Sequence, residues 1–97
     1  MKTIELIPVF VEQLPLEVEE GKMYITEKYG ISVHLCACGC GEKTFLPFSH
    51  IINGVDHGWV HTIQDSKVST NPSIGNWLWE NPYHAHYFIV NNKIVWC

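Results

Sequence analysis

The run CACGCG at residues 36–41 constrains the fold of this chain more than any other feature. In an extended strand, residues two apart share a face, but Cys36 and Cys40 would then lie about 13 Å apart at roughly 3.3 Å per residue. One tetrahedral zinc ion, with Zn–S bonds of about 2.3 Å, cannot bridge that gap. The chain must therefore bend here, and Gly39 and Gly41 permit the backbone angles of a bend. We predict a turn in which two or three thiolates converge.

The bulk composition describes a folded, acidic protein. The 97 residues suffice for one domain, 1–97, and hydrophobic residues make up 46% of them against 16% charged residues. The net charge is −4 and no block of Lys or Arg occurs, which argues against nucleic acid as a partner. Glu5, Pro8 and Glu12 interrupt the apolar N-terminal stretch, so neither a signal peptide nor a membrane span is expected.

We therefore expect a cytoplasmic protein that does not bind membranes. In the reducing cytosol, cysteines serve as thiols or metal ligands rather than disulfides. The alternative for the cysteine run is that small buried cysteines only pack well in the core. Three cysteines interleaved with glycine favour a metal site, and we expect one Zn²⁺. Cys97, at the end of the sequence, is more simply incidental.

The spacing of turn residues predicts a mainly β fold. Five prolines and seven glycines separate short apolar runs, and no long run has helical period. We expect a small single-domain antiparallel β fold built around the zinc site, with few or no helices. The last two strands should form a hairpin at Asn91-Asn92, and the stretch 70–83 should be a long connection that carries Trp77 and Trp79. The expected strands are 3–7, 22–26, 31–35, 44–48, 59–63, 67–69, 84–90 and 93–96.

A zinc ion needs ligands from outside the cysteine run as well. His84 and His86 are the best source, because residues i and i+2 of a strand share a face. For each, the ordinary alternative is a hydrogen-bonded histidine of the surface or core. His34 is a weaker candidate. His61 is expected to be structural or to face the substrate.

Two further residues are candidates for catalysis. Glu42 follows Cys40 by two positions, and a glutamate beside a zinc-bound water can act as general base; a solvated turn carboxylate is an equal alternative. Ser73 could stabilise the local turn by hydrogen bonds or orient a metal ligand. Trp77 and Trp79 are expected to line a substrate groove, although large aromatics also fill the core of small β domains.

The motifs HLCACGCGEK, NPSIGNW and HYFIVNNKIVW, in this order, resemble a small bacterial family of zinc proteins. Its members accompany ubiquitin-like conjugation operons of the Bub type (BubE-like) and occur in phages. The resemblance covers about residues 22–96. It implies that Cys38, Cys40 and His86 are the most secure metal ligands and that Cys36 is the next most secure. The family pattern has a cysteine where this chain has Tyr83, so either His84 replaces it or the ion has one protein ligand fewer.

The number of ligands separates two functions. An open zinc site would make the chain a zinc-dependent hydrolase, a small metallopeptidase that processes or removes ubiquitin-like modifiers, with Glu42 moving the proton. A site closed by four ligands would make it a non-catalytic module that binds a ubiquitin-like protein or a conjugation enzyme. We expect the hydrolase, acting on a protein or peptide.

Overall fold

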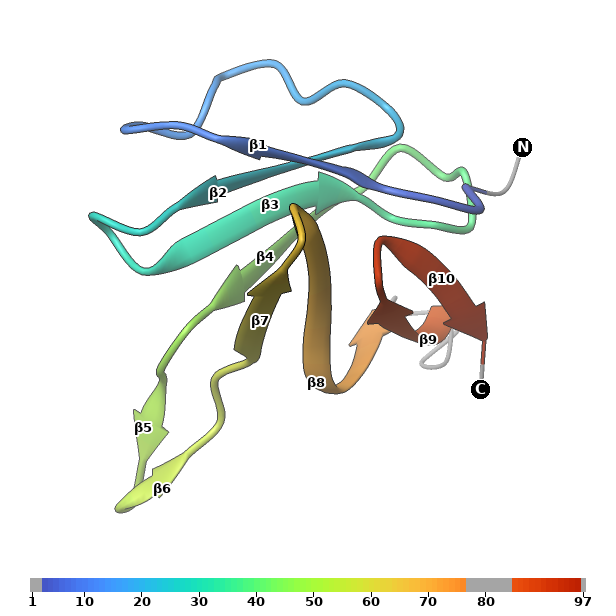
Figure 1. Ribbon diagram of the computed structural model, residues 1–97. Helices are drawn as coiled ribbons and strands as arrows, with labels where there is room; N and C mark the ends of the chain where they lie inside the picture. The colour runs from blue at the N-terminus through green and yellow to red at the C-terminus, as the bar shows by residue number, and fades with distance from the viewer. Residues whose placement is uncertain (1–2, 77–84, 97) are drawn as a thin grey trace.

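A computed structural model of the chain describes residues 3–76 and 85–96 (Figure 1). Within these residues it contains strands and no helix, which confirms the expected mainly β fold. The strands are β1 (Ile7–Phe10), β2 (Lys22–Thr26), β3 (Ile31–Leu35), β4 (Lys43–Pro47), β5 (Ile51–Ile52), β6 (Val55–Asp56), β7 (Val60–Gln64), β8 (Lys67–Asn76), β9 (Ala85–Val90) and β10 (Lys93–Trp96).

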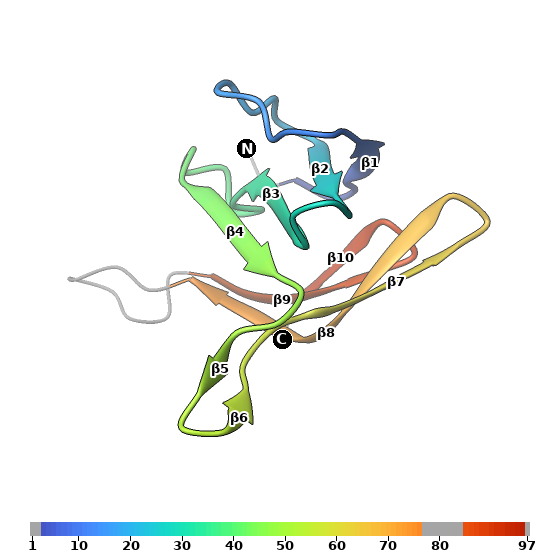
Figure 2. The same ribbon diagram turned by 90° about the vertical axis from the view of Figure 1, so that its left-hand side faces the viewer.

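Two four-stranded sheets and one small ribbon make up the architecture. The first sheet has the order β1-β2-β3-β4 and the second the order β10-β9-β8-β7. All pairs are antiparallel except β1–β2, which is parallel. The strands of the two sheets run at a steep angle to one another, and the chain passes from β4 to β7 through the β5–β6 ribbon, which projects away from both sheets (Figures 1 and 2).

The core lies between the two sheets. Each sheet turns one face inward, because alternate residues of a strand point to the same side. On β9, for example, Tyr87 and Ile89 are fully buried while His86 and Val90 are exposed. The fully buried apolar side chains come from both sheets and from the cysteine run: Leu6, Met23, Ile25, Cys36, Ala37, Leu46, Val68, Ile74, Tyr87 and Ile89.

The sequence predicts several strands with their exact bounds, and the exceptions have physical reasons. Strands 22–26, 31–35 and 93–96 occur as expected. The first strand begins only at Ile7, and Glu5 instead forms an isolated bridge with Lys93. The expected connection 70–83 is wrong over its first part, because β8 continues to Asn76. Pairing with β7 and β9 there overrides the turn preference of the NPSIGN residues.

The β5–β6 ribbon has no counterpart in the expected strands. Its turn is Asn53-Gly54, with φ of 51° and 80°. An Asn-Gly pair between aliphatic residues is a strong hairpin signal, so the sequence did contain the information. In the described part of the chain, the structure has no helix long and apolar enough to cross a membrane.

Candidate functional site

Ser73 and His86 form a hydrogen-bonded pair on adjacent strands. The Ser73 Oγ and His86 Nε2 atoms are 2.7 Å apart. Ser73 lies on β8 and His86 on β9, where His86 pairs with Gly75. Both side chains lie on the face of the second sheet that points away from the core. The next residue along each strand, Ile74 after Ser73 and Tyr87 after His86, is buried and therefore points to the opposite side. The pair is therefore open to solvent and to a substrate.

A β-bulge presents the serine. Thr70 pairs with Ile89 and Ile74 with Tyr87, so three residues of β8, namely 71–73, lie opposite Phe88 alone. The bulge contains Pro72, which has no N–H to donate to a ladder and is tolerated where pairing is interrupted. Bulges re-aim side chains and are over-represented next to active sites. Here the bulge brings the hydroxyl of Ser73 to the imidazole of the neighbouring strand.

Trp59 holds the backbone of the bulge in place. Its indole Nε1 donates a hydrogen bond to the carbonyl oxygen of Ser73, at 3.3 Å, and its ring packs against the core. The backbone N–H of Trp59 donates to the Pro47 carbonyl at 2.8 Å. A residue of the crossover between the sheets thus supports the carbonyl group of the serine that the bulge presents.

His61 connects Trp59 to the first sheet. Its Nδ1 is 2.9 Å from the Trp59 carbonyl oxygen, and its Nε2 is 2.8 Å from Ser32 Oγ on β3 of the other sheet. Burial lowers the pKa of His61, and the hydrogen bond to Trp59 opposes this in part. Both ring nitrogens are engaged inside the protein. This leaves neither of them for a substrate, which was one of the two roles expected for this residue.

The three cysteines converge at the turn between β3 and β4. Their Sγ atoms all lie within 4.8 Å of one another, and those of Cys36 and Cys38 are 3.4 Å apart. Two tetrahedral Zn–S bonds of about 2.3 Å place their sulfurs about 3.8 Å apart, so the spacing suits one ion. The bend at Gly39 and Gly41 is present, with φ of 90° and 86°. The cluster could hold a metal ion.

Hydrogen bonds of the backbone shape this turn. The N–H of Cys36 donates to the Glu42 carbonyl at 2.8 Å, and the N–H of Gly39 donates to the Cys36 carbonyl at 3.1 Å. The N–H of Glu42 points at the Sγ of Cys40, at 3.4 Å. Glu42 therefore closes the turn through its backbone, while its side chain is exposed. Cys36 is buried and Cys40 exposed, so one side of the cluster is open to further ligands.

Two of the histidines expected near the metal, His86 and His34, are not part of the cysteine cluster among the described residues. His86 is not in the group of metal-ligating atoms that the described residues form, and its partner is Ser73. His34 is fully buried, with its Nε2 2.7 Å from the hydroxyl of Tyr87 on the opposite sheet. Burial, and to a lesser extent nearby His61, lower the pKa of His34 to about 4. His84, Trp77 and Trp79 lie outside the described residues.

Comparison with known proteins gives one family. The model of the family "Bacterial ubiquitination-like system serine protease (BubE)" matches residues 10–97. No curated protein and no solved structure matches the chain. The match agrees with the resemblance to Bub-type operons that the sequence motifs indicate, and its ubiquitination-like system points to a protein substrate.

The expected reaction, however, is wrong. The family is described as serine proteases, so a zinc-dependent metallopeptidase is not the function that this chain inherits, and the role of Glu42 as proton shuttle of such an enzyme falls with it. The non-catalytic alternative gains no support from the family description either. From the sequence, both Ser73 and His86 were expected to act at the metal. The missed signal was that this serine and this histidine, thirteen positions apart, lie on two strands that can pair.

Proposed function

Since this chain belongs to the BubE family of bacterial ubiquitination-like system serine proteases, we propose that Ser73 is its nucleophile and His86 its general base. The observation that carries the proposal is the 2.7 Å contact between Ser73 Oγ and His86 Nε2 on an outward-facing bulge. A serine hydroxyl is a weak nucleophile until an adjacent base takes its proton, and 2.6–3.2 Å is the reach such a base needs.

The pair supports the following reaction. In the tautomer with the proton on Nδ1, His86 Nε2 accepts the hydroxyl proton of Ser73 while Oγ attacks the carbonyl carbon of an amide bond. The C–N bond breaks, and the leaving amine takes the proton from His86. Water, deprotonated by the same imidazole, then hydrolyses the acyl-serine ester and releases a carboxylate. The proposed substrate is the amide bond that follows the C-terminus of a ubiquitin-like modifier.

Within residues 3–76 and 85–96, no carboxylate is hydrogen-bonded to the other nitrogen of His86. The proposed machinery is thus a serine–histidine pair in this part of the chain. Trp59 contributes by holding the Ser73 carbonyl, and therefore acts as a positioning residue. Pro72 has no N–H, so the backbone N–H of Ser73 is the nearest candidate in the bulge to stabilise the oxyanion, since the bulge interrupts its ladder with β9.

The proposal is tested with a fluorophosphonate probe and with cleavage of a ubiquitin-like fusion protein. Ser73→Ala should abolish labelling and lower kcat by about a thousandfold or more, because the nucleophile is lost. His86→Gln should slow both labelling and cleavage strongly. Mass spectrometry of the labelled protein should place the probe on Ser73.

Ser69→Ala is the matched control, since Ser69 lies on β8 and turns to the same face four residues earlier. It should label and cleave like the parent protein. Cleavage that survives Ser73→Ala, or a probe attached to another residue, would remove this pair from the mechanism.

A second proposal concerns the cysteine cluster. We propose that Cys36, Cys38 and Cys40 bind one Zn²⁺, which stabilises the turn between β3 and β4. The support is the convergence of three soft thiol ligands at the spacing of one tetrahedral ion. The ion would act on stability, because the hydrolysis proposed above uses only side chains and water.

A further inference from the structure

The β5–β6 ribbon carries aliphatic side chains that are exposed to solvent. Ile51, Ile52 and Val55 have exposed fractions of 62%, 47% and 57%. Ile52 and Val55 face each other directly across the two strands. The ribbon projects from the body of the molecule, so these side chains have no core of their own to join (Figure 2). A two-stranded hairpin is only marginally stable in water. The exposed aliphatic side chains near its tip therefore do not serve to stabilise the fold, and a role in binding is expected for them.

The base of the ribbon is held firmly. The carboxylate of Asp56 accepts hydrogen bonds from the N–H of His50 at 2.9 Å, the N–H of Gly58 at 2.8 Å and the hydroxyl of Ser49 at 3.0 Å. These donors, the His50 N–H first, hold the pKa of Asp56 below its usual range. The His57 N–H donates to the His50 carbonyl at 2.7 Å. The ribbon is therefore presented in a defined direction.

Close packing of the backbone adds to this. A Cβ atom on Gly58 would lie only 2.4 Å from the Phe48 carbonyl oxygen and 2.5 Å from Ser49 Cα. Only glycine allows these two segments of the chain to approach so closely. The same approach lets the next residue, Trp59, donate its backbone N–H to Pro47 and its indole N–H to Ser73. The ribbon base and the backbone of the nucleophile are thus joined by consecutive residues.

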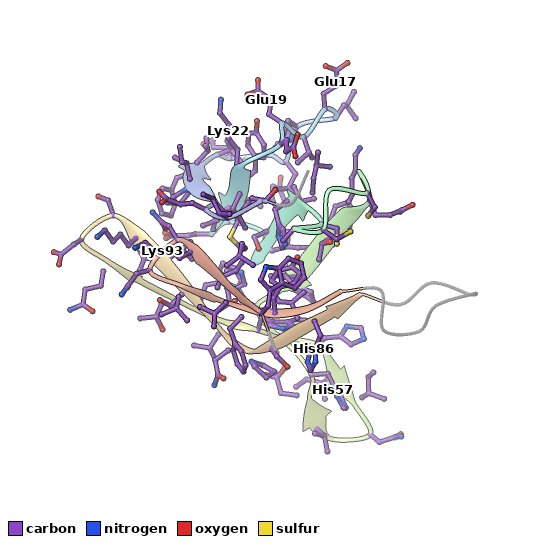
Figure 3. All side chains as sticks on the ribbon, turned by 90° about the vertical axis from the view of Figure 1, so that its right-hand side faces the viewer. Glu17, Glu19, Lys22, His57, His86 and Lys93 are labelled. Carbon is purple, nitrogen blue, oxygen red and sulfur yellow. The ribbon has the colours of Figure 1, made fainter. Side chains whose placement is uncertain are left out.

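The ribbon and the Ser73–His86 pair lie on the same side of the second sheet. His57, at the base of the ribbon, and His86 both lie on the side that points away from the first sheet (Figure 3). From Val55 to Trp59 there are four residue steps, which span at most about 14 Å. The Trp59 side chain then spans the rest of the way to the Ser73 carbonyl, so an extended peptide of about six to seven residues covers the whole distance. The aliphatic tip is therefore within reach of a substrate whose tail lies on Ser73.

We propose that the β5–β6 ribbon is the docking surface for the folded part of the ubiquitin-like substrate whose C-terminal tail reaches Ser73. This proposal rests on the proposed function. Ile52 and Val55 contact an apolar patch of the modifier, and the tail runs from this contact along the outer face of the second sheet. A membrane is the poorer occupant, since segment 48–58 contains no Lys or Arg to attract anionic lipid and the net charge is −4.

The test compares two substrates with the same leaving group. One is an intact ubiquitin-like protein of the same conjugation system with a C-terminal aminocoumarin amide, and the other is a peptide of its last residues with that amide. The double variant Ile52→Ser/Val55→Ser should raise KM for the protein substrate about tenfold or more, since each tenfold corresponds to about 1.4 kcal/mol. Its kcat/KM for the peptide should stay within about twofold of the parent.

The matched control is Ile4→Ser/Leu16→Ser, which changes two exposed aliphatic residues away from the ribbon, with exposed fractions of 80% and 91%. It should leave both substrates unaffected. Binding of the intact modifier to Ser73→Ala protein, with and without the ribbon substitutions, gives a readout independent of turnover; the ribbon substitutions should weaken it by the same factor as KM.

Three outcomes would overturn the docking proposal: unchanged kinetics for both substrates, an equal loss for both, or a concentration-dependent dimer of this chain that the ribbon substitutions abolish. The last would make a second copy the occupant. Failure of the proposed function is distinguishable, because it shows as cleavage that survives Ser73→Ala whatever the ribbon variants do.

Discussion

A serine on a regular strand points to one side of its sheet and meets only the residues directly opposite or diagonal to it on the next strand. Ser73 differs because the bulge at 71–73 shifts the pairing of β8 against β9, and its Oγ reaches His86 Nε2 at 2.7 Å. Geometry of this kind tolerates little error, since a displacement of about 1 Å costs about a hundredfold in rate. Trp59, which holds the carbonyl of Ser73 by a hydrogen bond, should therefore also affect the rate.

Trp59→Phe tests that residue. The substitution keeps an aromatic ring against the core and removes the N–H that donates to the Ser73 carbonyl, together with the second ring of the indole. We expect kcat to fall about tenfold while KM changes by less than about twofold, because the serine is misplaced and the substrate-binding surface is intact. Steady-state kinetics and the rate of fluorophosphonate labelling measure the effect.

Trp96→Phe is the control for that experiment, because it removes another indole N–H from a ring that packs on Tyr87. It should leave kcat close to that of the parent. If Trp59→Phe lowers the melting temperature Tm but leaves kcat and the labelling rate unchanged, Trp59 is structural and does not position the serine.

The turn between β3 and β4 is separate from the Ser73–His86 pair. It lies in the first sheet, whereas Ser73 and His86 lie in the second. Its three thiols converge because Gly39 and Gly41, both with positive φ, bend the chain there. Three sulfur atoms within 4.8 Å of one another offer a cation three soft ligands, and the free energy of binding it would stabilise the turn.

Loss of the metal should therefore destabilise the protein. The purified chain should contain about one zinc per molecule, and Cys38→Ser should lower Tm by about 10 °C or more, because the binding energy of a structural zinc is folding energy. Elemental analysis and thermal unfolding are the measurements. Cys97→Ser should leave both unchanged. A zinc-free preparation with the parental Tm would contradict the metal site.

Short strands can be predicted from the sequence where turn residues mark where they begin. Turn residues directly precede 22–26, 31–35 and 93–96, and these strands were predicted to the residue. β8 was predicted too short, because its NPSIGN stretch is turn-forming by propensity and becomes a strand only through its two neighbours. Pairing between distant segments is the information that local patterns lack.

The two sheets are joined by histidines that span the core. His61 on β7 contacts Ser32 on β3, and His34 on β3 contacts Tyr87 on β9. Both histidines have a pKa below the usual value, chiefly because burial disfavours their charged forms. At the scale of the whole molecule, these contacts make the packing of one sheet on the other sensitive to pH.

The sign of this sensitivity follows from linkage. Below about pH 6.5 the unfolded chain takes up protons at these histidines, whereas the folded chain resists protonation because their folded pKa is lowered. The free energy of unfolding should therefore fall as the pH drops below about 6.5, by at most about 1.4 kcal/mol per pH unit for each histidine. His61 is partly exposed and should contribute less than this limit.

His61→Gln isolates one of the two, because glutamine keeps hydrogen-bonding capacity without titrating. Urea unfolding at pH 7.5 and 5.5 should show a smaller acid-induced loss of stability in the variant than in the parent, because the variant lacks the His61 titration and also the part of the lowering of the His34 pKa that His61 causes. An equal loss in the two proteins would mean that His61 titrates alike in the folded and unfolded states.

The site as a whole was only partly accessible from the sequence. The cysteine bend followed from bond lengths and glycine positions, and it is present in the structure. The partners of Ser73 and His86 did not follow, because a hydrogen bond between strands depends on register, and here the register changes within β8. Both residues were identified, but they were assigned to the chemistry of the metal rather than to each other.

The bulge in β8 adds two residues relative to β9, since 71–73 lie opposite Phe88 alone. An even number preserves the alternation of inward and outward side chains, so Thr70 and Ile74 both still point into the core on either side of it. A chain shortened by two residues here could pair β8 and β9 without interruption and bury the same core. Such a protein would have a regular hairpin at this place, and the proposed catalytic pair arises from a two-residue insertion into that hairpin.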